Sequence, residues 1–169
     1  DAVETAVQEV DKKIYPGGQF SVYYGTQTGT AESFAKQLER EGPEHGFLVH
    51  VVDLEDVEID DVMAVARRDA ESGITRAIFL SATYGEGEAP DNSTTFAASL
   101  KEKARSEILF DKVKHEDSTE PESSLAGLEY SVFGLGNRQY DHYNAMGKFI
   151  DHALERVGGV RILPVGVGD

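Results

Sequence analysis

Cysteine and tryptophan are both absent from this sequence of 169 residues. The lack of cysteine excludes disulfide bonds, cysteine-ligated zinc or iron–sulfur sites, thiolate nucleophiles and thiolate-bound haem. It also suits a reducing compartment. The lack of tryptophan leaves tyrosine to provide a ring that stacks on a planar ligand.

Long apolar runs and a basic leader are missing as well. No apolar run approaches the ~18 residues that a membrane-spanning helix needs, and residues 1–10 lack the basic and apolar regions of a signal peptide. Positive charge is scarce, because 16 lysine and arginine residues face 31 acidic residues and give a formal net charge of −15. Nucleic acid and anionic membranes are polyanions and therefore poor partners, whereas a basic protein surface fits.

What the sequence does contain is the composition of one globular domain. The hydrophobic fraction is 40%, and the length suits a single core without disulfides or metal. Residues 1–18 indicate an amphipathic helix and a linker, and a domain follows over residues 19–169. The expected strands of this domain span residues 20–24, 47–52, 77–81, 130–133 and 160–165, and the expected helices span residues 31–38, 60–71, 92–104 and 146–157.

This alternation of strands and helices predicts an α/β fold with a doubly wound, five-stranded parallel sheet. The polar residues 105–124 are expected to form a surface insertion that is partly mobile. The sequence ends directly after the fifth strand, where a doubly wound sheet normally carries one more helix. We therefore expect part of one sheet face to be left uncovered by this chain and to pack against something else.

Three unusual loops follow strands, and ligands of open parallel sheets bind beyond the carboxyl ends of the strands. The first loop (residues 25–31) combines two glycines with three threonine hydroxyl groups and precedes a helix, so it predicts a phosphate nest. It lacks the lysine of a Walker loop, which favours one permanently held phosphate monoester over a nucleoside triphosphate. A capped turn without a ligand is the alternative. The candidate residues are Thr26, Gln27, Thr28, Gly29, Thr30 and Ala31.

The second loop (residues 82–91) places an aromatic residue between small, flexible ones. Tyr84 is suited to stack on a planar ligand, and Gly85 and Gly87 would allow a peptide to change its orientation. A plain turn with a surface tyrosine is the alternative. The candidate residues are Ala82, Thr83, Tyr84 and Gly85.

The third loop (residues 134–144) begins with Gly-x-Gly but has Gln139 where a dinucleotide-binding fingerprint needs glycine. Tyr140 is suited to form a second aromatic wall opposite Tyr84, and asparagine side chains can recognise polar ring edges. The candidate residues are Leu135, Gly136, Asn137, Arg138, Gln139, Tyr140, Asp141, His142, Tyr143 and Asn144.

One phosphate nest and two aromatic walls at one sheet edge predict a site for flavin mononucleotide (FMN). No general base, nucleophile or metal-ligand cluster competes for these loops, so we expect neither a catalytic side chain nor a metal site.

The three loops also carry a family resemblance. The segments YGTQTGTAE (24–32), ATYGEGEAPDN (82–92) and FGLGNRQYDHYNAMGK (133–148) resemble the flavodoxin-like domain of the diflavin reductases, and the last segment favours the branch that serves cytochrome P-450. The resemblance extends over residues 20–169. It implies a flavodoxin-like fold, with residues 26–31 on the FMN phosphate, Tyr84 and Tyr140 on the two faces of the isoalloxazine ring, and residues 82–85 and 135–144 lining the remainder. Gly85 would lie near flavin N5.

The resemblance also implies an oxidoreductase of which this chain is the FMN half. The family takes hydride from NADPH onto FAD in a separate domain and passes electrons singly through FMN to a haem protein. This sequence has no room for the FAD/NADPH part, and it ends at Asp169, within a Gly-Asp-Asp run of the family. Such an enzyme would lie on the cytoplasmic side, and an endoplasmic reticulum anchor would precede Asp1; this chain itself would not touch the membrane.

Two clusters of acidic residues are consistent with either a solvated surface or a docking face for a basic haem protein. Residues 53–61 hold six acids, and Glu86, Glu88, Asp91 and Asp141 lie in the second and third loops. Electrostatic steering would raise the rate of association with such a partner.

Other functions remain alternatives at this point. The chain could be the FMN domain of another branch, of the sulfite reductase, nitric-oxide synthase or methionine synthase reductase type, or a flavin-free binding module on the same fold. A phosphoryl-transfer receiver shares the architecture but needs an acidic pair after the first strand and an aspartate at the end of the third. Gly25-Thr26 and Ser81-Ala82 occupy those places.

Overall fold

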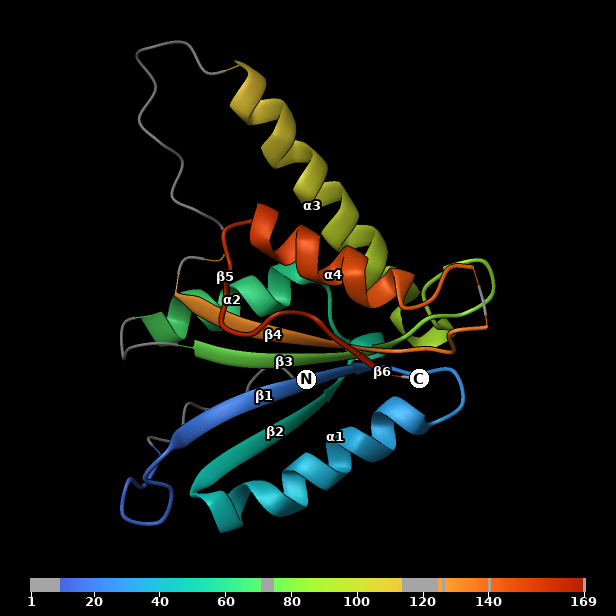
Figure 1. Ribbon diagram of the computed structural model, residues 1–169. Helices are drawn as coiled ribbons and strands as arrows, with labels where there is room; N and C mark the ends of the chain where they lie inside the picture. The colour runs from blue at the N-terminus through green and yellow to red at the C-terminus, as the bar shows by residue number, and fades with distance from the viewer. Residues whose placement is uncertain (1–9, 71–74, 114–124, 126, 140, 169) are drawn as a thin grey trace.

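A computed structural model of the chain describes residues 10–70, 75–113, 125, 127–139 and 141–168. Its centre is a parallel sheet with the strand order β2-β1-β3-β4-β5, in which β6 also pairs with β4 (Figure 1). The strands are β1 (Gly18–Gly25), β2 (Phe47–Asp53), β3 (Thr75–Ala82), β4 (Leu128–Leu135), β5 (Val160–Arg161) and β6 (Gly166–Gly168).

Helices cover both faces of this sheet. α1 (Thr30–Glu41) lies on one face, and α2 (Ile59–Ala70), α3 (Thr94–Val113) and α4 (Ala145–Arg156) lie on the other (Figure 1). Short 3-10 turns follow α1 (Gly42–His45) and β2 (Leu54–Asp56) and precede α3 (Asp91–Ser93). The doubly wound architecture expected from the sequence is thereby confirmed.

Two apolar clusters hold the layers together because successive strand residues point to opposite faces. Tyr23 and Phe79 point toward α2 and α3, and their rings stack with centroids 5.0 Å apart. Val22 and Leu80, one position along each strand, pack instead beneath α1. Strands that are buried on both faces explain the near-continuous apolar run predicted for β3.

The prediction of one strand over residues 160–165 was wrong in its boundaries. The fifth position of the sheet is shared by β5 and β6, with residues 162–165 between them. Pro164 lies in this interruption, where its missing N–H group cannot contribute to a strand ladder.

The third helix was predicted to end at residue 104, but α3 continues to Val113. No glycine or proline interrupts residues 105–113, and Arg105, Glu107, Leu109 and Lys112 are strong helix formers, so nothing in the local sequence ends the helix at residue 104. The insertion therefore begins later than expected, and residues 114–124 lie outside the described residues.

The predicted amphipathic helix near the N-terminus falls mainly on residues 1–9, which also lie outside the described residues. Residues 10–17 form turns, in which the N–H groups of Ile14 and Tyr15 donate to the carbonyl of Asp11. None of the helices in the described part combines the length and the apolar character needed to cross a membrane.

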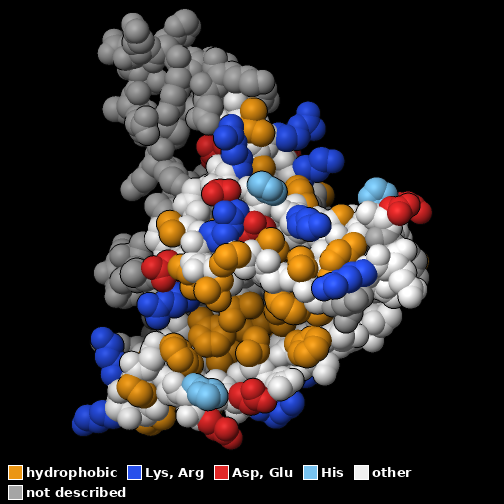
Figure 2. Space-filling model, in the orientation of Figure 1, with side chains coloured by type: hydrophobic (Ala, Val, Ile, Leu, Met, Phe, Trp, Pro, Cys, Tyr) orange, Lys and Arg blue, Asp and Glu red, His pale blue; other side chains and the backbone are white. Residues whose placement is uncertain are grey.

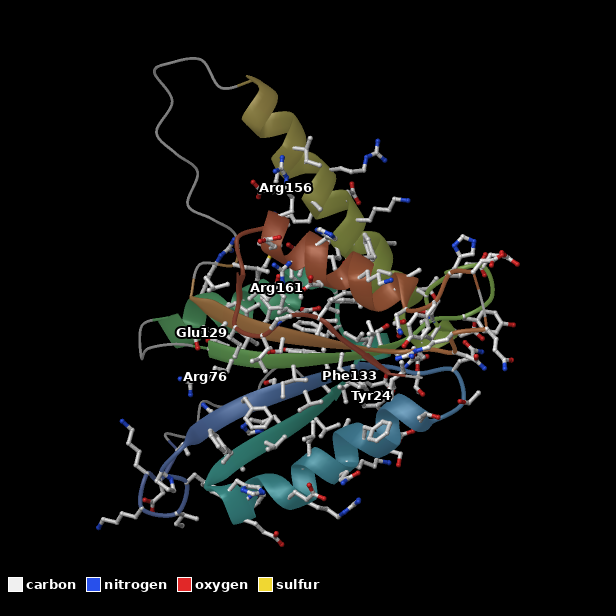
Figure 3. The ribbon with its side chains drawn as sticks, in the orientation of Figure 1. Tyr24, Arg76, Glu129, Phe133, Arg156 and Arg161 are labelled. Atoms are coloured by element: carbon white, nitrogen blue, oxygen red, sulfur yellow. The ribbon has the colours of Figure 1, made fainter. Side chains whose placement is uncertain are left out.

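The sheet face that carries α1 is only partly covered at β4. α1 packs on β1, β2 and β3, and the side chain of Phe133 on β4 remains 39% exposed. Figure 2 shows a broad apolar surface on this side of the molecule, and Figure 3 labels Phe133 there. The ion pair between Arg76 of β3 and Glu129 of β4 (Nε to Oε2, 3.1 Å) lies toward the other end of these strands.

Candidate functional site

The register of the sheet brings the three loops to one edge. At their carboxyl ends, β1 pairs with β3 through Gly25 and Ser81, and β3 pairs with β4 through Ala82 and Leu135. The first loop therefore lies beside the second, and the second beside the third. The crevice between β1 and β3 is also the point at which the strand order reverses, where ligands of such sheets bind.

The first loop leads into the start of α1 and carries no basic side chain. Gly29 adopts a left-handed conformation (φ 90°) and its N–H group donates to Thr26 Oγ1 over 2.9 Å. Thr28 Oγ1 and Thr30 Oγ1 lie 3.4 Å apart. The first N–H groups of a helix have no partner within the helix and carry its positive dipole end, so this loop offers donors to an anion without a basic side chain.

Three hydrogen bonds connect the first loop to the 3-10 turn (Asp91–Ser93) that precedes α3. The N–H group of Thr26 donates to Asn92 Oδ1 over 2.8 Å. Gln27 and Asp91 exchange two bonds, from Gln27 Nε2 to Asp91 Oδ2 (3.1 Å) and from the Asp91 N–H group to Gln27 Oε1 (3.0 Å). The Gln27 side chain, predicted to bind the cofactor, is thus engaged with a neighbouring loop.

The Asp53 carboxylate at the end of β2 anchors this arrangement. It accepts from the Tyr24 hydroxyl (2.9 Å), from Asn92 Nδ2 (2.8 Å) and from the Glu55 N–H group (2.9 Å). Burial, followed by the hydrogen bond to Asp53, raises the pKa of Tyr24 well above its ordinary value, so the phenol stays protonated and donates.

Sequence reasoning missed Tyr24, Asp53 and Asn92. The only signal was positional: Tyr24 and Asp53 end adjacent strands and Asn92 follows the second loop. The side-chain bonds among them depend on the strand register, which no local pattern states.

Between the second and third loops lies a pocket of about 350 Å³. Tyr84 is 48% exposed and stands at this pocket. All of the lining residues were predicted as site residues: Thr83, Tyr84, Gly85, Gly136, Asn137, His142, Tyr143 and Asn144.

The second loop is a tight turn that packs against the third. The N–H group of Tyr84 donates to the Glu88 carbonyl (3.0 Å), and the Glu88 N–H group donates back (2.8 Å). Gly85 and Gly87 between them have φ values of 49° and 103°, a region that disfavours side chains. A Cβ atom at Gly87 would lie 3.2 Å from His142 Cβ, so the two loops are in contact.

Asn144 closes the third loop in a left-handed conformation (φ 54°) and is fully buried. Its Nδ2 group donates to the Gly168 carbonyl of β6 over 3.2 Å. Its Oδ1 atom and the buried Tyr143 hydroxyl have no hydrogen-bond partner among the described residues. Arg138 and Lys148 lie about 6 Å from the centre of the Tyr143 ring and contribute cation–π attraction.

The predicted residues of the second and third loops include some that line the pocket and others that lie beside it. Ala82 and Leu135 end β3 and β4. Thr83 links loop to helix, because its Oγ1 atom accepts from the Met146 N–H group of α4 (3.2 Å). Tyr140, the predicted second wall, lies outside the described residues. The exposed residues of the third loop are Asn137, Arg138, Gln139, Asp141 and His142.

A second hollow of about 350 Å³ lies beside the start of α2. Carboxylates dominate its lining, which comprises Glu55, Asp56, Val57, Glu58, Asp60, Asp61 and Thr95. Such a surface repels a phosphate and suits cations instead. No grouping of histidine and acidic side chains in the described segments has the arrangement of a metal site.

Comparisons with known proteins agree with this geometry. The flavodoxin family model matches residues 22–169. The NADPH–cytochrome P450 reductase of Sus scrofa is 36% identical over 160 residues, which are 95% of this chain and 20% of that protein. The reductase of Salmo trutta is 36% identical over 166 residues, or 98% of this chain and 24% of that protein. The chain thus spans about a fifth to a quarter of the length of these relatives.

Solved structures support the same fold. A short-chain flavodoxin associated with a bacterial microcompartment superposes with a TM-score of 0.63 at 20% identity, covering 89% of this chain and 83% of that one. The oxidised flavodoxin 1 of Bacillus cereus gives 0.59 at 17% identity, covering 89% and 86%.

Proposed function

This chain belongs to the flavodoxin family, and from that premise we propose that it is an FMN-binding electron-transfer domain. The observation that carries the proposal is the pairing, at one sheet edge, of an uncharged anion nest with a pocket that presents the half-exposed ring of Tyr84. An elongated ligand with one phosphate and one planar ring system matches both features.

The residues present fit FMN on three observations. The pocket volume of about 350 Å³ lies within the range of small-ligand sites. The pocket is lined by small residues and aromatic rings, among them Gly85, Gly136 and Tyr84. The first loop supplies backbone and hydroxyl donors for a phosphate monoester.

Each part of the chain has a distinct task in this proposal. The hydroxyl groups of Thr28 and Thr30, together with the first N–H groups of α1, donate hydrogen bonds to the phosphate. Tyr84 stacks on one face of the ring, and Tyr140 provides the opposite wall. Residues 82–85 and 135–144 line the remainder, with Gly85 near N5. When bound, FMN supplies the capacity to exchange electrons one at a time, which no side chain of this sequence offers.

For the whole protein we propose the reductase arrangement that its relatives' names describe. Electrons would arrive from an FAD/NADPH module in the same polypeptide and leave for cytochrome P450 or another haem protein. Glu86, Glu88 and Asp141 are exposed around the pocket and would attract a basic partner surface. In this proposal the whole protein would lie on the cytoplasmic side of the endoplasmic reticulum, held by an anchor that this sequence does not contain.

Titration of the apo protein with FMN, followed by flavin fluorescence quenching, tests the proposal. We expect saturable binding of one FMN per chain and the visible flavin absorption bands. Thr28→Ala and Thr30→Ala should weaken FMN binding by about tenfold each, the value of a hydrogen bond to a charged group, and should leave riboflavin binding unchanged. A folded protein that ignores FMN would instead be the flavin-free binding module.

A further inference from the structure

The side chain of Asn92 is hydrogen-bonded both to the backbone of the first loop and to the Asp53 carboxylate. Its Oδ1 atom accepts from the Thr26 N–H group at 2.8 Å, and its Nδ2 group donates to Asp53 Oδ1 at 2.8 Å. We propose that Asn92, oriented by Asp53, is a positioning residue that sets the conformation of the phosphate-binding loop. The inference rests on the proposed function, because it assigns a role in holding the FMN phosphate.

The chemistry of the bridge needs a carboxamide. One end of the side chain faces an N–H donor and the other faces an ionised acceptor, so residue 92 must accept at one end and donate at the other. Asparagine does both in a single short side chain. An aspartate in its place would present oxygens to both neighbours and would confront the Asp53 carboxylate with a like charge.

Asp53 fixes which way the carboxamide points. Because its Oδ1 atom attracts the Nδ2 group, the Oδ1 atom of Asn92 is left to face Thr26. Asp53 is itself held by the Tyr24 hydroxyl and the Glu55 N–H group. Tyr24 is 8% exposed in the core beneath α1, so the chain of contacts runs from the rigid sheet to the loop.

The bridge also decides which donors of the first loop face a ligand. Asn92 takes the Thr26 N–H group, and Thr26 Oγ1 takes the Gly29 N–H group. The hydroxyls of Thr28 and Thr30 and the start of α1 are left as the donors for a phosphate. A Cβ atom at Gly25 would lie 2.8 Å from Ser93 Oγ, so the loop and the start of α3 are already in close contact on the other side of Thr26.

The test compares FMN with riboflavin, which lacks the phosphate. We expect Asn92→Ala to raise the dissociation constant for FMN by about tenfold, the effect of one lost hydrogen bond and a displaced loop, and to change that for riboflavin less than threefold. Thr94→Ala is the matched control, because it removes a different hydrogen bond from the same helix start (Thr94 Oγ1 to the Asp91 carbonyl, 2.7 Å). Its FMN affinity should stay within threefold of wild type.

The pH dependence of FMN binding to Asn92→Asp provides a further test, because a purely structural role of residue 92 would not make the FMN affinity depend on pH. Two adjacent carboxylates share a proton at low pH and repel each other when both are ionised. The FMN affinity of Asn92→Asp divided by that of the wild type should therefore be near one at pH 5 and should fall by about tenfold at pH 8. This comparison within one folded variant remains available if Asn92→Ala does not fold.

The outcomes separate the two proposals. Wild-type FMN binding with unchanged affinity in Asn92→Ala overturns the role of Asn92 alone. Equal losses for FMN and riboflavin, or equal losses in Asn92→Ala and Thr94→Ala, overturn it as well, because they indicate general loosening. A wild type that binds no FMN overturns the proposed function and this inference with it.

Discussion

Gly134 of β4 and Gly147 of α4 are in backbone contact: a Cβ atom at Gly147 would lie 2.7 Å from the Gly134 Cα atom. This approach seats the first turns of α4 directly on the sheet, beneath the third loop. Residue 147 needs to be glycine for steric reasons, because the obstructing atom is backbone and cannot rotate away. A Cβ atom at Gly134 would instead meet the side chain of Asn144, 2.8 Å from its Oδ1 atom.

Gly147→Ala should destabilise the fold by about 1–3 kcal/mol through overpacking. The sign of the change in unfolding free energy is informative. Alanine has a helix propensity about 1 kcal/mol better than glycine, so the same substitution would stabilise a helix without this obstruction. Urea unfolding measures the difference. His152→Ala, an exposed position in the same helix, is the control and should change stability by less than about 0.5 kcal/mol. An increase in stability for Gly147→Ala would contradict the close contact.

Tyr84→Leu should weaken FMN binding about tenfold or more, because stacking on an aromatic face is lost together with part of the buried area. Tyr84→Phe keeps the ring and should bind within about threefold of wild type. Since Tyr84 is 48% exposed, neither change should alter the unfolding midpoint of the apo protein. Equal FMN affinity in the leucine variant would show that the ring does not contact the ligand.

Phe133 and Phe79 lie on opposite faces of the sheet and should respond differently to replacement. Phe133 is 39% exposed and Phe79 is fully buried. Phe133→Thr should cost less than about 1 kcal/mol, because threonine suits a strand and little packing is lost. Phe79→Ala should cost about 3–5 kcal/mol through cavity formation. Similar costs in denaturant unfolding would mean that the face around Phe133 is covered in solution.

The buried carboxylate of Asp151 in α4 should matter more than an exposed one. Arg161 Nε donates to Asp151 Oδ1 over 2.7 Å, and the side chain of Asp151 is 8% exposed. Asp151→Ala leaves the guanidinium without this partner and should cost about 2–4 kcal/mol. Glu32→Ala removes an exposed i,i+4 pair with Lys36 and should cost less than about 0.5 kcal/mol. Equal effects in unfolding experiments would contradict the difference in burial.

Ionisation of the buried Tyr130 should reduce the stability of the fold at high pH. Its hydroxyl donates to the Asp151 carbonyl (2.8 Å), and burial, followed by the Asp151 charge, raises the pKa of Tyr130 to about 12. The unfolded chain ionises at the ordinary pKa of about 10, so the folded state binds more protons between these values. The contribution of Tyr130 to stability should be constant below about pH 10 and should fall by about 2–3 kcal/mol as the pH rises to about 12.

Unfolding free energies at pH 8 and pH 11.5, with tyrosinate absorbance as a second signal, measure this decline. Tyr24, whose pKa is also raised, contributes in the same direction. Tyr130→Phe should therefore reduce the decline without abolishing it. A decline of the same size in the variant would exclude Tyr130 as its source.

Most of the architecture could be predicted from the local sequence. The strands and helices were recognisable because apolar spacing has a period of two or 3.6 residues, and glycine and proline mark the ends. The errors of the sequence-based prediction have local causes too. Residues 105–113 contain no glycine or proline to end a helix within a polar stretch, and Pro164 divides an apolar run that otherwise resembles one strand. The pocket residues Tyr84 and Tyr143 were predictable because loops after parallel strands meet at one edge.

By itself, then, the sequence determined the fold class, the three loops and the kind of ligand they suit, because these depend on residue type and on spacing along the chain. Tertiary structure alone decided that Asn92 would join Thr26 to Asp53 and that Gly147 would rest on Gly134. Residues 39 and 66 positions apart meet there only because the strand register and the helix-to-sheet distance place them together. Periodicity encodes which face a side chain takes, and it does not encode which distant partner it meets.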